Sequence, residues 1–341
     1  IPAIVEMPYN DIVRKFIDMY AGRLRNQVSF MLSACNFYMP IFEEALDAYG
    51  LPLELRYLPI IESALNPSAI SRAGASGLWQ FMIGTGKIYG LESNSLVDDR
   101  RDPIKATWAA ARYLKEMYAI YGDWNLVIAA YNCGPGTINK AIRRANGETD
   151  YWKIYNYLPK ETRGYVPAFI AANYVMTYYC DHNICPMETN IPASTDTVQV
   201  NKNLHFEQIA DLCNVPLDQV KSLNPQYKKM MIPGASKPYT LRLPIEAISN
   251  FIDKQDTIYA HRADELFRNR KTVAVKDITP ATRKAATAVA GKGKLSYHTI
   301  KSGDTLSSIA GRYGVSVKDI QRWNGLSSTK IAAGKRLKIY K

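Results

Sequence analysis

An internal repeat in the C-terminal part of the sequence restricts the fold more strongly than any other feature. Residues 206–225, which read "FEQIADLCNVPLDQVKSLNP", align without a gap on residues 306–325, "LSSIAGRYGVSVKDIQRWNG". Identical residues stand at several aligned positions: Ile209 and Ile309, Ala210 and Ala310, Val215 and Val315, and Asn224 and Asn324. A short alternating segment precedes each copy and another follows it, which is typical of β-strands. The repeat therefore predicts two small α+β modules, each with the order βααβ.

The part of the chain before this repeat has a different character. Up to about residue 190, apolar residues recur at helical spacing, as in "PIKATWAAARYLKEMYAIYG", and the polar passage "ETNIPASTDT" then leads into the first module. A chain of 341 residues has room for two to four domains. We therefore expect a multidomain protein, with a mainly α domain before the two βααβ modules. The expected boundaries are 1–44 for an N-terminal helical segment packing on the main domain, 45–190 for the main helical domain, 196–245 for a degenerate first module, 246–294 for a basic spacer and 295–341 for the second module.

Net charge and cysteine content limit the classes of partner and site. A formal net charge of +12 suits nucleic acid, anionic lipid or an acidic cell-wall polymer, and it is also compatible with nonspecific surface charge. The basic residues are scattered or lie in the spacer, without a recognised reading element, so we expect no nucleic-acid partner. The five cysteines include no Cys-x-x-Cys pair, which argues against a zinc site. Cys180 and Cys185 either close a small disulfide loop or remain free thiols.

Glu62 takes a position where helical spacing predicts a leucine. Leucines stand around it at spacings of four and three residues, at Leu51, Leu55, Leu58 and Leu65. Pro52 suits the first turn of the predicted helix. A carboxylate among leucines loses hydration, so its pKa should rise and it should hold a proton near neutral pH. The alternative is that Glu62 lies at the edge of the apolar face and pairs with Arg56 or Arg72.

Two further segments carry residue types that suit a sugar site. The turn "NPSAISRAGASGLWQF" is rich in small residues that let backbone approach a ligand, and it ends in Trp79 and Gln80. The segment "IAAYNCGPG" places Tyr131 and Asn132 at the C-terminal end of a helix that begins near Trp124, before a Gly-Pro-Gly stop. Taken alone, Tyr131 is better explained as a core aromatic residue with a satisfied hydroxyl.

Four short motifs together resemble the soluble-type lytic transglycosylases, whose catalytic domain has a goose-lysozyme-like fold. They are "ES" at 62, "GLWQF" at 77, "AYNCGPG" at 130 and "ETRGYVPAF" at 161, in the family's order and spacing. The resemblance implies that Glu62 is the catalytic acid and base. It implies supporting or sugar-binding roles for Ser63, Ser76, Gly77, Gln80, Tyr131, Asn132 and Tyr165. Two departures, Trp79 where Met is common and Cys133 where Ala or Ser is usual, remove no catalytic group but could alter the shape of the site.

The two repeats resemble the LysM module, a small glycan-binding unit. In the second copy "SGDTLSSIA" and "WNGL" fall at the family's positions, whereas the first copy lacks the Gly-Asp-Thr turn and has a longer loop before its last strand. By this resemblance, the glycan-binding residues of the second copy are Gly303, Asp304, Thr305, Leu306 and Ile331. The alternative is that Asp304 or Thr305 only caps the first helix.

The chemistry implied by the resemblance needs one carboxylate, whereas ordinary glycosidases need two. The other acids between the first and third motifs are Glu92, Asp98, Asp99, Asp102, Glu116 and Asp123, and none is an obvious partner for Glu62. Family members cleave the β-1,4 bond between N-acetylmuramic acid and N-acetylglucosamine, and the muramoyl C6 hydroxyl closes a 1,6-anhydro ring. Two alternatives stay open: a hydrolytic muramidase on the same fold, and a noncatalytic wall-binding protein.

The resemblance also implies a partner and a location. Peptidoglycan glycan strands would be the partner, no metal or organic cofactor is implied, and we expect a monomer. The location would be the bacterial periplasm or cell envelope, with outer-membrane association as a lipoprotein, and any export signal or lipid anchor at the N-terminus was either removed or never part of this sequence. No apolar run reaches the roughly 18 residues that a transmembrane helix needs.

Overall fold

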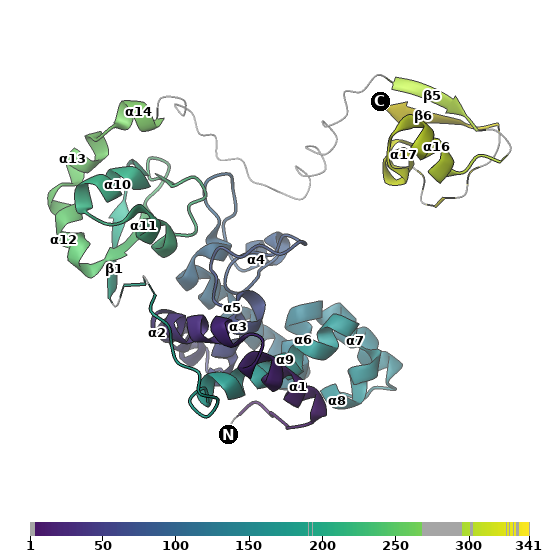
Figure 1. The fold of residues 1–341 in the computed structure, drawn as a ribbon, viewed down its shortest axis with the longest axis horizontal. Coiled ribbons are helices and arrows are strands. Elements are labelled where there is room, and N and C mark those ends of the chain that lie inside the picture. Colours follow the sequence, from purple (N-terminus) through teal and green to yellow (C-terminus); the bar gives the residue numbers. More distant parts are fainter. Residues whose placement is uncertain are drawn as a thin grey trace. The chain divides into compact units, whose positions relative to one another are not determined.

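The computed structural model describes residues 4–189, 191–192, 194–267, 295–300, 303–324, 326, 328–329, 331 and 334–340. The chain divides into two compact units, Ile1–Asp277 and Ile278–Lys341, which are described separately (Figure 1). Residues 268–294 of the expected spacer lie outside the described residues. Within the described part, none of the helices combines the length and the apolar character needed to cross a bilayer.

The first unit begins with the mainly helical domain that the sequence predicts. Its helices, with η for 3-10 turns, are α1 (Asp11–Ala21), α2 (Arg25–Ala48), η1 (Leu53–Tyr57), α3 (Leu58–Ser63), α4 (Ile83–Ile88), η2 (Asp99–Arg101), α5 (Pro103–Tyr121), α6 (Trp124–Cys133), α7 (Pro135–Arg144), α8 (Tyr151–Ile154), η3 (Tyr155–Tyr157) and α9 (Lys160–Thr177). Helix α6 ends where the Tyr-Asn segment predicts, but Pro135 begins α7 because proline suits a first helical turn.

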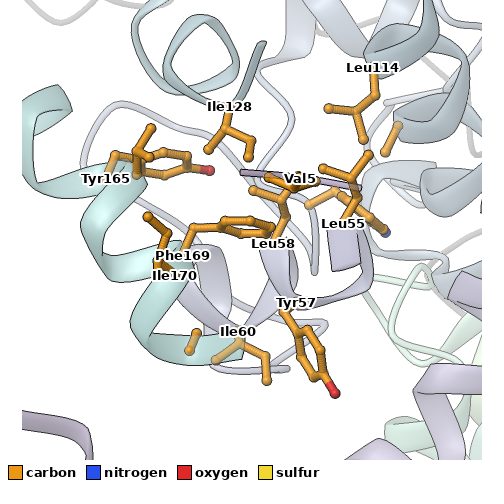
Figure 2. Packing of buried hydrophobic residues seen from close by; sticks show 14 of the residues in the cluster. Val5, Leu55, Tyr57, Leu58, Ile60, Leu114, Ile128, Tyr165, Phe169 and Ile170 are labelled. Atoms are coloured by element: carbon orange, nitrogen blue, oxygen red, sulfur yellow. The ribbon is translucent and has the colours of Figure 1, made fainter. Parts of the chain in front are cut away.

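Helix α9 is central to this domain, because α1, α3 and α6 all pack against it. Figure 2 shows Tyr165, Phe169 and Ile170 of α9 beside Leu58 and Ile60 of α3 in one apolar cluster. The N-terminal helices contribute apolar side chains to the same core, including Val13, Ile17 and Val28. Burying such side chains is the main favourable contribution to folding, at about 1.5 to 3 kcal/mol for each large one. This core holds α3, and with it Glu62, against α9.

The segment around Glu62 is not the single helix that the leucine spacing predicts. The chain forms the 3-10 turn η1 and then the short helix α3, which ends at Ser63 because Ala64 and Leu65 have φ angles of 52° and 58°. Pro59 explains the break, since it has no N–H to continue a helical ladder from the preceding turn. The leucines are buried nevertheless, with Leu51, Leu55, Leu58 and Leu65 exposed by 8% or less.

The first repeat forms the predicted βααβ module, with additions. Strand β1 (Thr195–Val200) pairs antiparallel with β4 (Tyr239–Pro244), and α10 (Phe206–Cys213) and α11 (Leu217–Leu223) lie between them in the chain. The longer loop contains a second antiparallel pair, β2 (Asn203–His205) with β3 (Met231–Pro233). The prediction of a spacer is wrong for residues 246–267. This part of the chain forms α12 (Ile245–Asp253), α13 (Gln255–Ala260) and α14 (Ala263–Phe267). Phe251 and Ile258 are fully buried in the module's core.

The second unit repeats this design in its simplest form. Strand β5 (Leu295–Thr299) pairs antiparallel with β6 (Arg336–Tyr340), with α16 (Leu306–Tyr313) and α17 (Val317–Asn324) between them in the chain. Asn324 donates to the carbonyl of Lys338 at 2.8 Å and accepts from its N–H at 2.7 Å. Asn224 makes the same pair of bonds to Arg242, at 2.8 and 2.9 Å. The shared asparagine therefore joins the second helix to the last strand in both copies.

Candidate active site

Glu62 lies in the last turn of α3, on the wall of a pocket of about 410 Å³. Its Oε1 accepts a hydrogen bond from the hydroxyl of Tyr165 on α9. Its Oε2 has no hydrogen-bond partner among the described residues, so that oxygen is available to a ligand in the pocket. One oxygen of the carboxyl group is thus held by the protein, and the other is without a hydrogen bond from the described residues.

The surroundings of Glu62 raise its pKa to about 7 from an ordinary value of 4.5. The main cause is burial, which disfavours the charged form, and the hydrogen bond from Tyr165 opposes it by favouring the carboxylate. The negative charge of Glu161, in the first turn of α9, raises the pKa further. At neutral pH a substantial fraction of Glu62 is therefore protonated and able to act as an acid.

The structure contradicts the alternative in which Glu62 pairs with an arginine. Arg56 forms its ion pair with Glu43, and Arg72 is exposed. No Lys, Arg or His side chain lies within ion-pairing distance of Glu62 among the residues that the structure describes. The raised pKa and the missing counter-charge agree, since a nearby cation would lower the pKa of the carboxyl group.

The chain that follows α3 contributes residues 69–71 and Gln80 to the pocket wall. Residues 74–81 are called here the pocket loop. Gln80 lines the pocket and has a positive φ of 47°, and its Nε2 donates to the carbonyl of Gly77 at 2.8 Å. Ser63 donates to the carbonyl of Leu78 at 3.0 Å, so the residue after Glu62 ties α3 to this loop. Of the predicted sugar-binding residues, Ser63 and Gln80 therefore share the pocket with Glu62.

Gly77 gives the pocket loop its shape. Its φ is +88°, in the left-handed region, and an added Cβ would lie 1.7 Å from the carbonyl oxygen of Arg100. Only glycine permits both this backbone conformation and such a close approach. Gly77 does not line the pocket, so the structure gives it a part in the loop's conformation.

Ser76 and Trp79 point away from the pocket. Ser76 is fully buried and accepts a hydrogen bond from Nε of Arg101 at 3.1 Å. Trp79 is also fully buried, where its ring packs edge-on against Phe42 and its Nε1 donates to Thr107 at 2.9 Å. The expectation that the ring of Trp79 belongs to the sugar site is wrong, because this tryptophan fills the core behind the loop.

Tyr131 and Asn132 lie behind the pocket and connect its parts. The hydroxyl of Tyr131 donates to the carbonyl of Trp79 at 2.7 Å, and its pKa is raised by burial and by the charge of Glu62. Asn132 accepts from the hydroxyl of Thr162 on α9 at 2.9 Å. Neither residue lines the pocket in this conformation. Tyr131 holds the pocket loop from α6, and Asn132 joins α6 to α9.

Part of the pocket wall was not predicted from the sequence. Tyr20 of α1 and Gln27 and Met31 of α2 line it. All three precede the four recognised motifs in the sequence. Periodicity marks Tyr20 and Met31 as apolar-face residues but gives no sign of a ligand. Glu161 belongs to the fourth motif, but the family resemblance implies no role for it. Tyr20, Gln27 and Met31 come close to Glu62 only through the packing of α1 and α2 on the rest of the domain.

The other acidic residues between the first and third motifs are occupied elsewhere. Asp98 pairs with Arg100, Asp99 with Lys105, Glu92 with Lys237 and Glu116 with Arg112, while Asp102 and Asp123 cap α5 and α6. Glu62 is the single carboxylate among the described residues that line the pocket. The described part of the chain also contains no group of three or more His, Cys, Asp or Glu side chains placed to hold a metal ion.

The second module places its predicted glycan-binding residues in different settings. Ile331 lines a pocket of about 480 Å³ together with Ile300 and Asn324. Leu306 is buried in the module's core, and Thr305 caps α16 in a capping box with Ser308, as the alternative reading of the sequence predicts. Asp304 lies 2.8 Å from Nε2 of His298. Gly303 has a positive φ of +89°, which suits a turn before the helix.

Comparisons with known proteins identify the families that three parts of the chain match. Residues 39–154 match the family described as "Transglycosylase SLT domain", residues 194–260 match "Lytic transglycosylase MltD, LysM-like domain" and residues 298–339 match "LysM domain". The membrane-bound lytic murein transglycosylase D of Escherichia coli K12 is 32% identical over 339 residues, which cover 98% of this chain and 70% of that protein. The chain belongs to the membrane-bound lytic murein transglycosylase D family.

More distant relatives match smaller parts of the chain. The soluble lytic murein transglycosylase of Escherichia coli K12 is 33% identical over 124 residues, or 35% of this chain and 19% of that protein. The crystal structure of the 70 kDa soluble lytic transglycosylase from Escherichia coli matches with a TM-score of 0.37 at 29% identity, over 42% of this chain and 24% of that one. Membership of the transglycosylase D family confirms the fold class predicted from the motifs, a lysozyme-like helical domain with LysM modules.

Proposed function

We propose that Glu62 cleaves peptidoglycan as the single catalytic acid and base of a lytic transglycosylase. The chain belongs to a family of lytic murein transglycosylases, and its LysM modules fit the same glycan substrate. The bond cleaved is the β-1,4 linkage between N-acetylmuramic acid and N-acetylglucosamine. The observation that carries the proposal is one carboxyl group, with a pKa of about 7, on the wall of a pocket that no other described carboxylate lines.

The first step uses the protonated form of Glu62. Glu62 donates its proton to the glycosidic oxygen, so the leaving N-acetylglucosamine departs as a neutral alcohol. Its free Oε2 is the oxygen placed to do this, since Oε1 is held by Tyr165. A general acid is most effective when its pKa lies near the working pH, and burial brings Glu62 there.

The second step uses the carboxylate that the first step leaves. Glu62 withdraws a proton from the C6 hydroxyl of the muramoyl residue, and that oxygen forms a bond to C1 to close the 1,6-anhydro ring. The nucleophile belongs to the substrate, so holding the sugar in place substitutes for activating a water molecule. Ser63 and Gln80 support this role by shaping the pocket, and Tyr165 by orienting the carboxyl group.

We further propose that the protein acts in the bacterial cell envelope, where peptidoglycan lies, with the helical domain at 45–190 cutting glycan and the module at 295–341 holding it. The Escherichia coli relative is described as membrane-bound. A lipid anchor, outer-membrane association and a monomeric state stay predictions from the sequence. In the second module, Ile331 is the predicted ligand-binding residue that lines a pocket.

Mass spectrometry of digests of purified sacculi tests the proposal. Wild-type protein should release muropeptides that have lost one water relative to a hydrolysed reducing end, because the 1,6-anhydro ring forms without water. Glu62→Gln should release none while keeping its circular dichroism spectrum. Glu44→Gln is the matched control, since Glu44 is exposed on α2, and it should behave as wild type.

Two alternatives predict different products from the same digests. A hydrolytic muramidase would yield hydrated reducing ends throughout, and it would need a second group to activate water. The acids considered for that role all lie away from the pocket wall. A noncatalytic wall-binding protein would yield no soluble muropeptides from the wild type. Either result would reject the proposed transglycosylase reaction.

A further inference from the structure

The first LysM-like module holds a loop of the helical domain inside its own core. Residues 92–98, between α4 and η2, are called here the docking loop. Leu96 and Val97 of this loop are buried with Phe206, Tyr227 and Leu241 of the module in one apolar cluster. The module therefore completes its core with side chains from the domain that carries Glu62.

Backbone hydrogen bonds fix the docking loop to the segment that precedes β3. The N–H of Asp98 donates to the carbonyl of Gln226 at 2.9 Å, and the N–H of Lys228 donates to the carbonyl of Leu96 at 2.8 Å. Val97 and Tyr227 form an antiparallel bridge between these bonds. The two segments therefore form a short two-stranded contact, which sets the docking loop's position along the module.

Lys228 adds a charged connection to the same contact. Its Nζ donates to the carbonyl of Asn94 at 2.8 Å and lies 3.5 Å from Oδ2 of Asp98. The side chain of Asp98 is only 1% exposed, and that of Lys228 is 22% exposed. Such a buried carboxylate needs cationic partners, because an unpaired charge away from water is strongly unfavourable.

Arg100 connects Asp98 to the pocket loop, because it forms hydrogen bonds to both. Nε and Nη2 of Arg100 donate to the two oxygens of Asp98, each at 2.8 Å. Nη1 of Arg100 donates to the carbonyls of Gly74 and Phe81, at 2.8 and 2.9 Å. These two carbonyls are the two ends of the pocket loop. A bidentate pair between guanidinium and carboxylate fixes the orientation of the guanidinium as well as its distance. Arg100 therefore holds the two ends of the pocket loop in a defined geometry.

We propose that Lys228, Asp98 and Arg100 form a relay through which the first LysM-like module holds the pocket loop in its substrate-binding shape. The three are positioning residues, since Gln80 of the pocket loop, and not the relay, lines the pocket with Glu62. The degenerate module is thus a structural part of the catalytic site, whatever its own affinity for glycan. This inference rests on the proposed function, because the bound substrate is taken to be glycan.

Hydrogen exchange of the full chain, followed by mass spectrometry of peptides, tests the relay without using activity. Lys228→Met keeps an apolar stem of similar length and removes the charge. We expect amides of residues 74–81 to exchange roughly tenfold faster, the factor that corresponds to loss of one charge-assisted hydrogen bond. Lys202→Met is the matched control, because Lys202 belongs to the same module but pairs with Asp256 on the surface. It should leave residues 74–81 unchanged.

Steady-state kinetics on soluble glycan strands supplies the functional measurement. Lys228→Met should raise KM several-fold and leave the pH at which kcat falls unchanged, because the surroundings of Glu62 are intact. Lys228→Arg keeps a cation at this position, so its exchange rates and its KM should stay close to those of wild type. Asp98→Asn, which removes the central charge at constant size, should loosen residues 74–81 in the same way.

Two outcomes would overturn the relay. One is wild-type exchange of residues 74–81 in both Lys228→Met and Asp98→Asn, even if the module itself exchanges faster. The other is a uniform acceleration over the whole chain, which would mean general destabilisation without a specific connection. Failure of the proposed function is a separate result, because it would be seen as a wild-type chain that forms no anhydro products.

Discussion

Tyr165 donates a hydrogen bond to Oε1 of Glu62 from a position 103 residues further along the chain. The bond crosses from α9 to α3, and the packing of Phe169 and Ile170 on Leu58 and Ile60 holds the two helices together (Figure 2). Tyr165 therefore does two things at once. It fixes which carboxyl oxygen is free, and it limits how far burial can raise the pKa of Glu62.

Replacement of Tyr165 should move the pH dependence of the reaction. Glu62 must be protonated to act as an acid, so kcat/KM should fall as the pH rises through about 7. In Tyr165→Phe the carboxylate loses a hydrogen bond that favours it, so the pKa of Glu62 rises further and the fall should move to higher pH. Tyr178→Phe at the end of the same helix should leave the profile unchanged. A fall that moves to lower pH in Tyr165→Phe would contradict this account of the pKa.

Glu62 should make the folded state less stable as the pH rises. Its pKa is about 7 when folded and 4.5 by the ordinary value, so between these values the folded state binds more protons than the unfolded state. The contribution to the free energy of unfolding is fully present below the lower value and lost through the higher one, at no more than about 1.4 kcal/mol per pH unit.

Urea denaturation of wild type and Glu62→Gln measures this contribution. The two midpoints should lie close together at about pH 5, and wild type should become the less stable of the two at about pH 8. Glu44→Gln serves as the control for removal of an exposed charge, and its difference from wild type should depend little on pH over this range. Parallel midpoints for wild type and Glu62→Gln at both values would show that Glu62 titrates normally.

Gly77→Ala should be much more destabilising than Gly90→Ala. Both glycines have positive φ, +88° and +83°, so each substitution incurs a backbone cost of about 1 to 2 kcal/mol. Only at Gly77 would the new Cβ meet another atom, the carbonyl oxygen of Arg100 at 1.7 Å, whereas nothing lies within 4 Å at Gly90. Thermal unfolding of the two variants gives the comparison. Equal melting temperatures would mean that the pocket loop can move away from Arg100 at little cost.

Asn324→Ala should loosen the second module without affecting the first. It removes the bonds to both backbone groups of Lys338, at an expected cost of roughly 1 to 2 kcal/mol. Hydrogen exchange should therefore accelerate in α17 and β6, and Asn224→Ala should have the same effect on α11 and β4. Lys318→Ala, on the exposed face of α17, is the control. An unchanged exchange pattern in Asn324→Ala would show that the asparagine shared by the two repeats is not structural.

The sequence was sufficient for features that depend on local pattern. Helical spacing and the repeat predict the mainly helical domain and the two βααβ modules, because amphipathic periodicity decides which face of an element is buried. The position of Glu62 among leucines also predicts its raised pKa. Burial raises the pKa of a carboxyl group, whichever part of the chain supplies the residues that bury it. The family motifs identify the transglycosylase class for a similar reason, as each is short and contiguous.

Features that depend on segments far apart in the chain were decided by tertiary structure alone. The sequence predicts one helix from residue 52, whereas the prolines and the packing on α9 give a 3-10 turn followed by the short helix α3. It predicts a spacer from residue 246, whereas Phe251 and Ile258 fill the core of the first module. Neither outcome follows from periodicity, because the partner that buries an apolar face is not part of the local pattern.

The same distinction applies to Glu62, the proposed catalytic residue, and the residues that surround it. The sequence by itself indicated Glu62, the type of reaction and the modules that accompany it. Only the folded chain decided that Trp79 fills the core, that Tyr20 of α1 lines the pocket, and that Lys228 of the first module contacts Asp98, which is bonded to Arg100. Hydrogen bonds and charge pairs act over a few ångströms in space, and the residues that they join here are far apart in the chain.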